Sequence, residues 1–523
     1  MGAIFGLVGD GSAGEVAAMG QRMAHRGGAI HVWSPAPGIH LGECAAEPPA
    51  RGPLALDAHL VGLDRPAIVG LIERQGLGAL AWASGYFSLA YCMEWPRQVV
   101  LACDTSGFKS LYYAELCGRI AFASEYKAFL ALQDFQPGLS RNAAQYYLAT
   151  KSFRMDQPLM QGVHALTAGT ALILRPGAGV RCETLRQDYW HPVRRRLRVR
   201  RPDLVRGTRE MLLRSVRRQS SGFTRVGLML SGGFDSGCVL ALLRHVRPEL
   251  EIGTYSIGFG PDDPELQGAR DLSVLYGTQH RELAFAPESI PELLPRLVWL
   301  MEDCGGREEA LLQYVALTEA CRHERVIFGG YGADALFGGM PRCRLVRLRE
   351  MLPFLGKPLR EIYQLTQSGA WPASLLGRLG GRLLEGRAGF APPRVSGAAG
   401  PVHVPDGMSL DELIAAQMCE AQDSGYIEAA LESLGAQFRD PFQATDMMDL
   451  ALSIPGRYNV GLLRQKKVLR EAVADLLPQG VLARGKSLQR IRHDLRLSRV
   501  LDALADRYLT VSTLRARGLV EPA

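Results

Sequence analysis

Residues 226–243 read Val-Gly-Leu-Met-Leu-Ser-Gly-Gly-Phe-Asp-Ser-Gly-Cys-Val-Leu-Ala-Leu-Leu, and this stretch decides the fold. An apolar strand pattern over 226–230 runs into Ser231-Gly232-Gly233, and an apolar helix pattern follows Asp235-Ser236. Where a strand turns directly into a helix through small residues, several backbone N–H groups point outward at the positive end of the helix dipole. The sequence therefore predicts a phosphate-binding loop.

The side chains of this loop extend the prediction. Gly232 and Gly233 allow the backbone to approach a ligand closely, and Ser231 and Ser236 add hydroxyl donors. Asp235 can hold a Mg²⁺ ion that bridges phosphate oxygens. The lysine of an ordinary P-loop is absent, so a P-loop NTPase is not indicated. The alternative, a strand–turn–helix corner whose small residues serve only packing, does not explain why so many ligand-type residues occur together.

Composition limits the class of protein. The chain has 523 residues, 47% of them hydrophobic and 22% charged, and a formal net charge of +7, which predicts two or three ordinary globular domains. We interpret the densest basic run, 194–201, as a solvated linker in preference to a docking patch for an anionic partner. It lacks the interleaved aromatic residues of nucleic-acid binding. Without a long apolar stretch, a signal peptide or paired cysteines, we expect a cytoplasmic protein with no membrane segment.

Two patterns divide the chain. Residues 1–190 predict short strands punctuated by Gly, Pro or Asp, residues 191–205 a basic linker, and residues 206–515 alternating strands and helices. Such alternation favours a doubly wound parallel sheet, which binds ligands at the carboxyl ends of its strands. A second loop of this kind, 329–334, follows a strand over 325–328, and the Gly- and Pro-rich segment 369–405 predicts a mobile surface insertion.

The individual elements are predicted from local periodicity. In the first part we expect strands at Ile4–Val8, Leu54–Leu60, Tyr86–Tyr91, Val99–Cys103, Ser110–Tyr113, Ile120–Ala123 and Ala171–Leu174, and helices at Ala13–Ala24, Ala67–Gln75 and Asn142–Tyr147. In the second part we expect a helix at Leu204–Arg218 and then elements at 225–230, 238–246, 251–257, 266–276, 288–303, 310–323 and 325–328.

The loop 231–236 resembles the pyrophosphate loop of the ATP-pyrophosphatase superfamily, whose members split ATP into AMP and pyrophosphate and so adenylate a substrate. Residues 253–259 and 277–280 resemble the nucleotide-binding strand and next βα unit of asparagine synthetases, and 330–339 resembles their second ligand loop. The resemblance implies ATP and Mg²⁺ as cofactors, with Asp235 and Asp334 as the metal ligands. The implied nucleotide site consists of Leu230, Ser231, Gly232, Gly233, Asp235, Ser236, Ser256, Gly330 and Gly332.

Three stretches in the N-terminal half of the chain resemble the glutaminase domain of the same family, namely 25–27, 104–113 and 122–127, so the resemblance extends over about residues 1–495. It implies an α/β protein with an Ntn-hydrolase-like αββα sandwich ahead of the doubly wound ATP-pyrophosphatase domain. Members that hydrolyse glutamine have a nucleophilic cysteine directly after the initiator methionine. Here residue 2 is Gly, and no Cys, Ser or Thr precedes Ser12. We therefore expect a domain without glutaminase activity and a substrate amine as the nitrogen source.

Tyr331 stands where asparagine synthetases usually carry Glu. A Tyr here resembles the β-lactam and carbapenam synthetases, in which it works with an acidic partner to deprotonate the attacking nitrogen. Gly425 occupies the aligned position of that partner, so Asp423 or Glu428 would have to replace it. A packing or stacking role for Tyr331 remains open.

Lys486 follows a segment, 464–470, that we expect to be a helix holding Arg464, Lys466, Lys467 and Arg470. Its position resembles that of the family's Lys that stabilises charge on the acyl-adenylate and the tetrahedral intermediate. A solvated surface lysine is the alternative.

Other departures separate the chain from the β-lactam synthetases. The Gly-rich stretch after their catalytic Lys is replaced by Ser487-Leu-Gln-Arg, and the segment 341–405, expected to be flexible, suggests a site open to a large substrate. These features resemble the lasso-peptide cyclases of antibiotic biosynthesis. We therefore expect an AMP-forming ligase that activates an Asp or Glu side chain of a precursor peptide for macrolactam formation with the peptide's own N-terminal amine. The expected partners are this peptide and a leader-processing protease, with no nucleic acid.

Three alternatives remain open at this stage. They are a β-lactam synthetase-like ligase, an asparagine synthetase that uses ammonia, and an inactive peptide-binding module. The intact loop 231–236, Asp334 and Lys486 count against the last of these.

Overall fold

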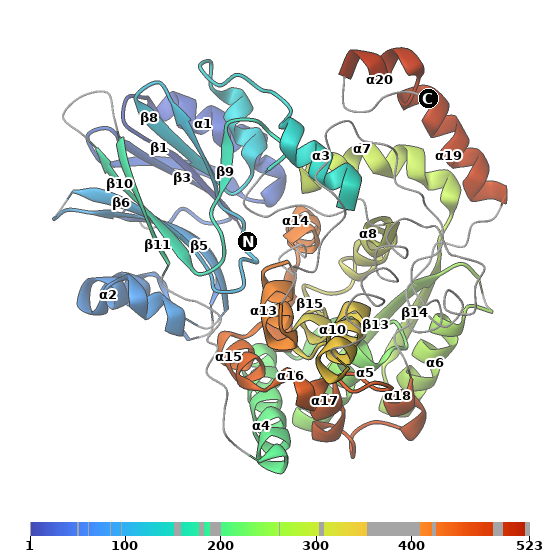
Figure 1. Ribbon diagram of the computed structural model, residues 1–523. Helices are drawn as coiled ribbons and strands as arrows, with labels where there is room; N and C mark the ends of the chain where they lie inside the picture. The colour runs from blue at the N-terminus through green and yellow to red at the C-terminus, as the bar shows by residue number, and fades with distance from the viewer. Residues whose placement is uncertain are drawn as a thin grey trace.

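A computed structural model describes residues 2–49, 52–60, 62–83, 85–95, 97–150, 158–176, 182–188, 200–260, 262–302, 308–352, 408–420, 425–484 and 495–517. In these ranges the chain forms two antiparallel sheets followed by one parallel sheet (Figure 1). The predicted insertion over 369–405 and most of the predicted basic linker lie outside the described residues.

The two antiparallel sheets form the N-terminal part. The first has the order β2-β3-β1-β8-β7-β9 and the second the order β11-β10-β6-β5-β4. Their inner faces pack on each other through Ile4, Leu101 and Phe122, while α1 covers the outer face of the first sheet and α2 that of the second. This layering confirms the predicted αββα sandwich.

The bounds of these elements are β1 Ala3–Val8, α1 Ala13–Arg22, β2 Ala29–Ala36, β3 Ile39–Ala45, β4 Leu54–Leu60, α2 Arg65–Gln75, β5 Gly85–Met93, β6 Gln98–Cys103, β7 Tyr112–Leu116, β8 Arg119–Ala123, α3 Arg141–Thr150, β9 Val163–Ala165, β10 Thr170–Pro176 and β11 Cys182–Asp188.

Some of the predicted N-terminal elements are displaced or incomplete. The strand predicted at Ser110–Tyr113 begins only at Tyr112 as β7. The buried carboxylate of Asp104 accepts the backbone N–H groups of Phe108 and Lys109 at 3.3 and 3.1 Å, which folds this segment into a loop before the strand. Strands β2 and β3 were not predicted, because polar residues interrupt the apolar pattern of their sequences.

The C-terminal part contains the parallel sheet, with the order β14-β13-β12-β15-β16 and every neighbouring pair parallel. This is the strand order of a doubly wound fold, which confirms the predicted class. Helices α4, α5 and α15 pack on one face of the sheet, and α7, α8 and α14 pack on the other.

The bounds here are α4 Arg201–Ser220, β12 Arg225–Met229, α5 Phe234–Val246, β13 Glu251–Gly258, α6 Pro264–Tyr276, β14 Gln279–Ala284, α7 Ile290–Met301, α8 Glu308–Ala320, β15 Val326–Phe328, α9 Gly332–Leu336, α10 Pro341–Met351, α13 Leu410–Glu420, α14 Gly425–Ser433, β16 Gln437–Arg439, α15 Thr445–Ser453, α16 Gly456–Asn459, α17 Lys467–Ala472, α18 Gln479–Ala483, α19 Leu495–Tyr508 and α20 Val511–Arg517.

Three predicted boundaries in this part differ from the structure. Residues 201–203, predicted only as linker, belong to α4, whose first turn contains the favourable Pro202 and Asp203. The segment 341–405, predicted to be flexible, begins with α10. The predicted helix over 464–470 begins only at Lys467, because Lys466 has a left-handed backbone with φ of 55°.

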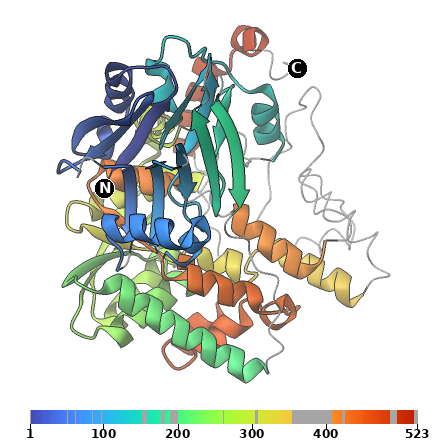
Figure 2. The ribbon, with the colours of Figure 1, turned by 90° about the vertical axis from the view of Figure 1, so that its left-hand side faces the viewer.

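The N-terminal and C-terminal parts meet at α14. Figure 1 shows α14 between the antiparallel sheets and the parallel sheet. In the view of Figure 2, α2 (blue) and α4 (green) lie on the side of the molecule that faces the viewer. Tyr86 and Phe108 of the N-terminal part belong to the same buried cluster as Ile427 and Phe438 of the C-terminal part. Among the described helices, none is both long and apolar enough to span a lipid bilayer.

Candidate active site

A cavity of about 310 Å³ lies at the carboxyl end of the parallel sheet. It opens between the loop after β12 and the loop after β15, where the strand order of the sheet reverses. Open α/β sheets bind their ligands at this place, because the two loops diverge to opposite faces. The cavity is therefore the candidate active site.

The loop after β12 has a conformation that requires glycine. Gly232 has φ of +67°, and a Cβ atom there would lie 2.6 Å from the backbone oxygen of Glu265. The Ser236 hydroxyl accepts the backbone N–H of Ser231 at 3.2 Å, and Arg484 donates to the carbonyl of Gly232. The loop is thus held in a fixed shape at the start of α5, which is the geometry that binds phosphate.

Two carboxylates in the lining of the cavity converge on one cation. The Nζ atom of Lys466 lies 2.6 Å from both carboxylate oxygens of Asp235 and 2.5 Å from Oδ1 of Asp334. Burial opposes the charge of Lys466, but the two carboxylates outweigh burial and raise the pKa of its ammonium group. Gly339 makes room for the pair, since a Cβ atom there would lie 2.0 Å from Asp334 Oδ1.

This arrangement fits a magnesium ion that arrives with a nucleotide. Two carboxylates that share one ammonium group at 2.5 to 2.6 Å are close enough to share a divalent cation. In the described part of the chain, no group of three or more His, Cys, Asp or Glu side chains could hold a metal ion. Phosphate oxygens and water would therefore have to complete the coordination, as is usual for Mg²⁺.

The structure brings most of the predicted nucleotide site together. The cavity is lined by Leu230, Ser231, Gly233, Asp235, Ser236, Ser256, Gly330, Tyr331 and Asp334. Gly232 and Gly332 lie behind this lining, where they pack against Glu265 and Phe442. Lys486 and Asp423 lie outside the described residues, and Glu428 belongs to α14 but its side chain is not among those described.

Several charged residues of the cavity were not predicted. The sequence prediction placed Lys466 in a helix over 464–470 without a role in the site, yet it lies between the two aspartates. Arg344, Arg464, Arg470 and Arg484 also line the cavity. Arg470 lies over the ring of Phe234 at 4.2 Å and donates to the carbonyls of Leu482 and Arg484. The basic run 464–470 was a usable signal, but only the fold shows that it faces the phosphate loop.

Tyr331 is held at the cavity by residues of β16 and the turn after it. Its backbone N–H donates to Oδ2 of Asp440 at 2.8 Å, and its ring lies 5.6 Å from that of Phe438. Asp440 is fully buried and also accepts the backbone N–H groups of Gly332 and Phe442. Burial nevertheless raises the pKa of Asp440 to about 7.

The raised pKa of Asp440 predicts a pH-dependent stability. Its ordinary pKa is 3.8, so between that pH and about 7 the unfolded chain is ionised while the folded protein holds the proton. The contribution of protonated Asp440 to the free energy of unfolding is complete below pH 3.8 and is lost as the pH rises to about 7. Above that pH, the free energy of unfolding no longer changes through Asp440. Urea titrations of the wild type and Asp440→Asn should show a stability difference that changes across this range. A constant difference would contradict the assignment.

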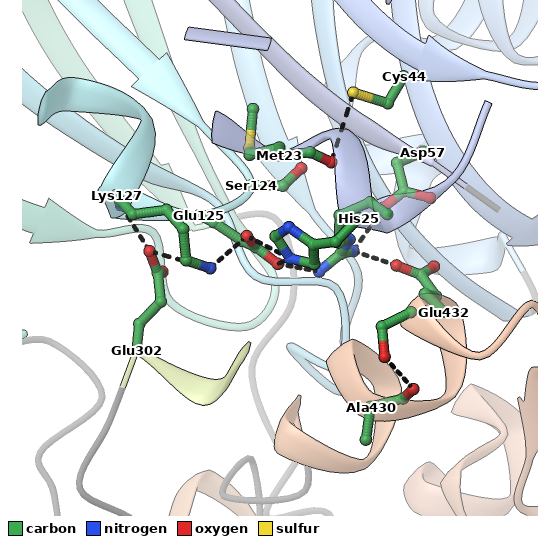
Figure 3. A network of polar contacts seen from close by, with 12 residues as sticks. Met23, His25, Cys44, Asp57, Ser124, Glu125, Lys127, Glu302, Ala430 and Glu432 are labelled. Atoms are coloured by element: carbon green, nitrogen blue, oxygen red, sulfur yellow. Dashed lines mark hydrogen bonds and ion pairs between the residues drawn. The ribbon is translucent and has the colours of Figure 1, made fainter. Parts of the chain in front are cut away.

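The N-terminal motif residues converge at the contact between the two parts of the chain. Nε2 of His25 lies 3.1 Å from Glu125, and Arg26 contacts Glu125, Asp57 and Glu432 at 3.2, 3.2 and 2.5 Å. Figure 3 shows Glu432 of α14 near Asp57 and His25, with Lys127 and Glu302 at the other end of the network. The stretches that resembled a glutaminase thus form a buried ionic network across the interface.

The geometry around Gly2 leaves no space for a nucleophilic side chain. A Cβ atom at Gly2 would lie 2.5 Å from the backbone oxygen of Cys44. The thiol of Cys44 itself points to the carbonyls of Gly20 and Met23, and burial raises its pKa to about 12. A thiol with that pKa is a poor nucleophile near neutral pH.

Comparison with known families agrees with these two sites. The asparagine synthase profile matches residues 207–523, and the glutamine amidotransferase domain profile matches residues 63–190. The chain belongs to the asparagine synthase family. This is a family of ATP-dependent ligases that form carbon–nitrogen bonds, and the predicted family and enzyme class are thereby confirmed.

Curated relatives are distant and aligned over different lengths. A putative asparagine synthetase [glutamine-hydrolyzing] of Mycobacterium bovis is 26% identical over 88% of this chain and 74% of its own. Asparagine synthetase [glutamine-hydrolyzing] 1 of Bacillus subtilis is 28% identical over 45% of this chain and 36% of its own. The amidase chry2 of Gibberella zeae is 27% identical over 55% of this chain and 44% of its own.

Among solved structures, the glutamine phosphoribosylpyrophosphate amidotransferase of B. subtilis with ADP and GMP is similar over 54% of this chain and 65% of that chain. The identity is 12% and the TM-score 0.25. A similarity of this size carries no argument about function.

Proposed function

We propose that the protein is an AMP-forming amide ligase of peptide natural-product biosynthesis that closes a macrolactam in a precursor peptide, as lasso-peptide cyclases do. The observation that carries the ligase chemistry is the convergence of Asp235 and Asp334 on one cation beside the phosphate loop. The filled space at Gly2 supports a substrate amine as the nitrogen source, because no ammonia is then generated within the protein.

The proposed reaction has two steps. A carboxylate oxygen of an Asp or Glu side chain of the peptide attacks the α-phosphorus of ATP, and pyrophosphate leaves. The peptide's N-terminal amine then attacks the acyl carbon, AMP leaves with the former carboxylate oxygen, and one proton is released from the nitrogen. A peptide that carries both groups makes the second step intramolecular, which replaces a bimolecular encounter by proximity.

The described residues have distinct parts in this proposal. Asp235 and Asp334 would hold Mg²⁺, which supplies charge neutralisation at the phosphates. The N–H groups of the loop 231–236 would bind the phosphates, and Lys466 and Arg470 would stabilise the charge of the departing pyrophosphate. Tyr331, with Asp423 or Glu428, would deprotonate the amine, and Lys486 would stabilise the tetrahedral intermediate.

We expect no glutamine hydrolysis, because no nucleophile fits beside Gly2 and the thiol of Cys44 is fully protonated near neutral pH. Release of glutamate from glutamine should stay at background with and without ATP. The variant Gly2→Ser should not gain the activity either, since its side chain would collide with the backbone of Cys44. Sustained glutamate release by purified protein would show that the nucleophile lies elsewhere.

Tyr331 at the cavity specifically favours a second candidate, a β-lactam synthetase-like ligase. Substrate-dependent exchange of pyrophosphate into ATP separates the possibilities. The proposal predicts exchange that depends on a precursor peptide with an internal Asp or Glu. Stimulation only by a small β-amino acid would favour the β-lactam synthetase, and stimulation only by aspartate would favour an ammonia-dependent asparagine synthetase. Peptide binding without any exchange would indicate an inactive module.

A further inference from the structure

Phe438, one of the residues that hold Tyr331, contacts the N-terminal part directly. Its ring lies 5.3 Å from that of Phe108 at an interplanar angle of 12°, and Phe108 lies 4.4 Å from Tyr86 at 30°. With Tyr331, which lies 5.6 Å from Phe438, these side chains form a four-ring column. The column begins in β5 of the second antiparallel sheet and ends at the candidate active site.

The first three rings of the column are buried, and Tyr331 at its end lines the cavity. Phe108 is 1% exposed and Phe438 2% exposed, so both rings are fully enclosed where the two parts of the chain meet. Buried rings in stacked contact have few alternative positions, because a displaced ring would leave a void. A shift of Phe108 would therefore displace Phe438, and the ring of Phe438 contacts that of Tyr331 in a tilted arrangement with an interplanar angle of 58°.

The position of Phe108 is itself fixed by its neighbours in the sequence. Asp104 accepts the backbone N–H groups of Phe108, Lys109 and Phe87 at 3.3, 3.1 and 3.2 Å. The fully buried ammonium group of Lys109 lies 2.8 Å from Asp57 and also donates to Glu432 of α14. Buried charges tolerate little displacement, because each depends on its partners for solvation.

The carboxylate of Glu432 is paired with cations of the N-terminal part, Arg26 and Lys109. Glu432 is 1% exposed, and although burial alone would raise its pKa, Arg26 and Lys109 hold that pKa well below its ordinary value. The carboxylate thus remains charged and paired with two cations of the N-terminal part. Since α14 leads directly into β16, this pair fixes the segment that carries Phe438 and Asp440.

We propose that Phe108 and Lys109 of the N-terminal part are positioning residues of the ligase site, which hold the Tyr331–Gly332 loop in place through Phe438 and α14. The glutaminase-like domain then contributes to amide formation without chemistry of its own. The effect on amide formation rests on the proposed function, in which Tyr331 acts on the amine. The effect on the loop itself does not depend on that function.

The test compares Phe108→Leu with Phe129→Leu in the full-length protein. Phe129 is a matched control, since it is also fully buried and contacts another ring, Phe135 at 5.8 Å, but both rings belong to the N-terminal part. In Phe108→Leu, the amides of Tyr331 and Gly332, which donate to Asp440, should exchange with solvent about tenfold faster than in the wild type. Phe129→Leu should leave these amides unchanged although it also lowers the melting temperature.

The two half-reactions give a second measurement. Phe108→Leu should keep peptide-dependent exchange of pyrophosphate into ATP within about twofold of the wild type, while amide formation falls on the order of tenfold or more through misplacement of Tyr331. Phe108→Ala, if it folds, should further accelerate hydrogen exchange at the amides of Tyr331 and Gly332 and should further lower the rate of amide formation. Equal behaviour of Phe108→Leu and Phe129→Leu in both measurements would overturn the inference. If the wild type forms no amide, the proposed function fails, and the exchange of the Tyr331 and Gly332 amides alone decides this inference.

Discussion

Asp235→Asn should lower pyrophosphate release from ATP by a factor of ~10³ or more, because the substitution removes one of two carboxylates that would hold Mg²⁺ against the phosphates. Asn keeps the shape of the side chain but not its charge. The ammonium group of Lys466 still has Asp334 at 2.5 Å, so the fold should survive. Release of pyrophosphate should be followed with a coupled assay over a range of Mg²⁺ concentrations.

Asp446→Asn is the control for this variant. Asp446 pairs with Arg218 at 3.0 Å and its side chain is 33% exposed, close to the 28% of Asp235, but it lies in α15 outside the cavity lining. It should retain nearly full activity. If Asp235→Asn released pyrophosphate as fast as this control, Asp235 would not hold a Mg²⁺ ion that the reaction needs. Formation of ADP and phosphate would contradict adenylation altogether.

Lys466→Met should lower pyrophosphate release on the order of a hundredfold, because the variant loses a buried cation that would face the departing phosphates. The same variant should respond more strongly to Mg²⁺ than the wild type does. Without Lys466, Asp235 and Asp334 face each other without their shared ammonium group, so added Mg²⁺ should raise the melting temperature of the variant more than that of the wild type.

The neighbouring Lys467→Met provides the comparison. Lys467 begins α17 and does not line the cavity, so its replacement should affect neither activity nor the response to Mg²⁺. If both lysine variants lost activity equally, the loss would reflect the net charge of the segment. An unchanged response of Lys466→Met to Mg²⁺ would show that the two aspartates do not form the metal site.

The predictable part of the site is the part that is continuous in the sequence. Ser231, Gly232 and Asp235 lie within one strand–loop–helix unit, and their chemistry follows from local geometry. The role of Lys466 could not be predicted, because a short basic run has the same pattern in a solvated helix as in an active site. In the structure, Lys466 has a left-handed backbone and contacts Asp235, which lies more than two hundred residues earlier in the chain.

The contact between the two parts of the chain could not be predicted from the sequence either, because its residues are far apart in the chain. Glu432 and Phe438 meet Lys109 and Phe108 across more than three hundred residues, and no local pattern distinguishes them from other core residues. Asp440 is similar, since its role depends on the N–H groups of Tyr331 and Gly332 that the fold brings beside it. The doubly wound parallel sheet, in contrast, was predicted from the alternation of strands and helices, and the αββα sandwich was implied by the family resemblance.

In the proposed reaction, a peptide carboxylate is adenylated and then captured by an amine of the same peptide. Each step leaves a separate isotopic and covalent trace, because the carboxylate oxygen that attacks ATP departs with AMP. A peptide whose Asp or Glu side-chain carboxylate carries ¹⁸O can therefore report both steps in one reaction.

The decisive measurement is mass spectrometry of such a labelled, leaderless precursor peptide after incubation with the protein, ATP and Mg²⁺. We expect that the peptide loses one water and resists carboxypeptidase, and that one ¹⁸O atom appears in an equimolar amount of AMP. A peptide that remains linear, or a closed product whose ¹⁸O is found in phosphate instead of AMP, would contradict it.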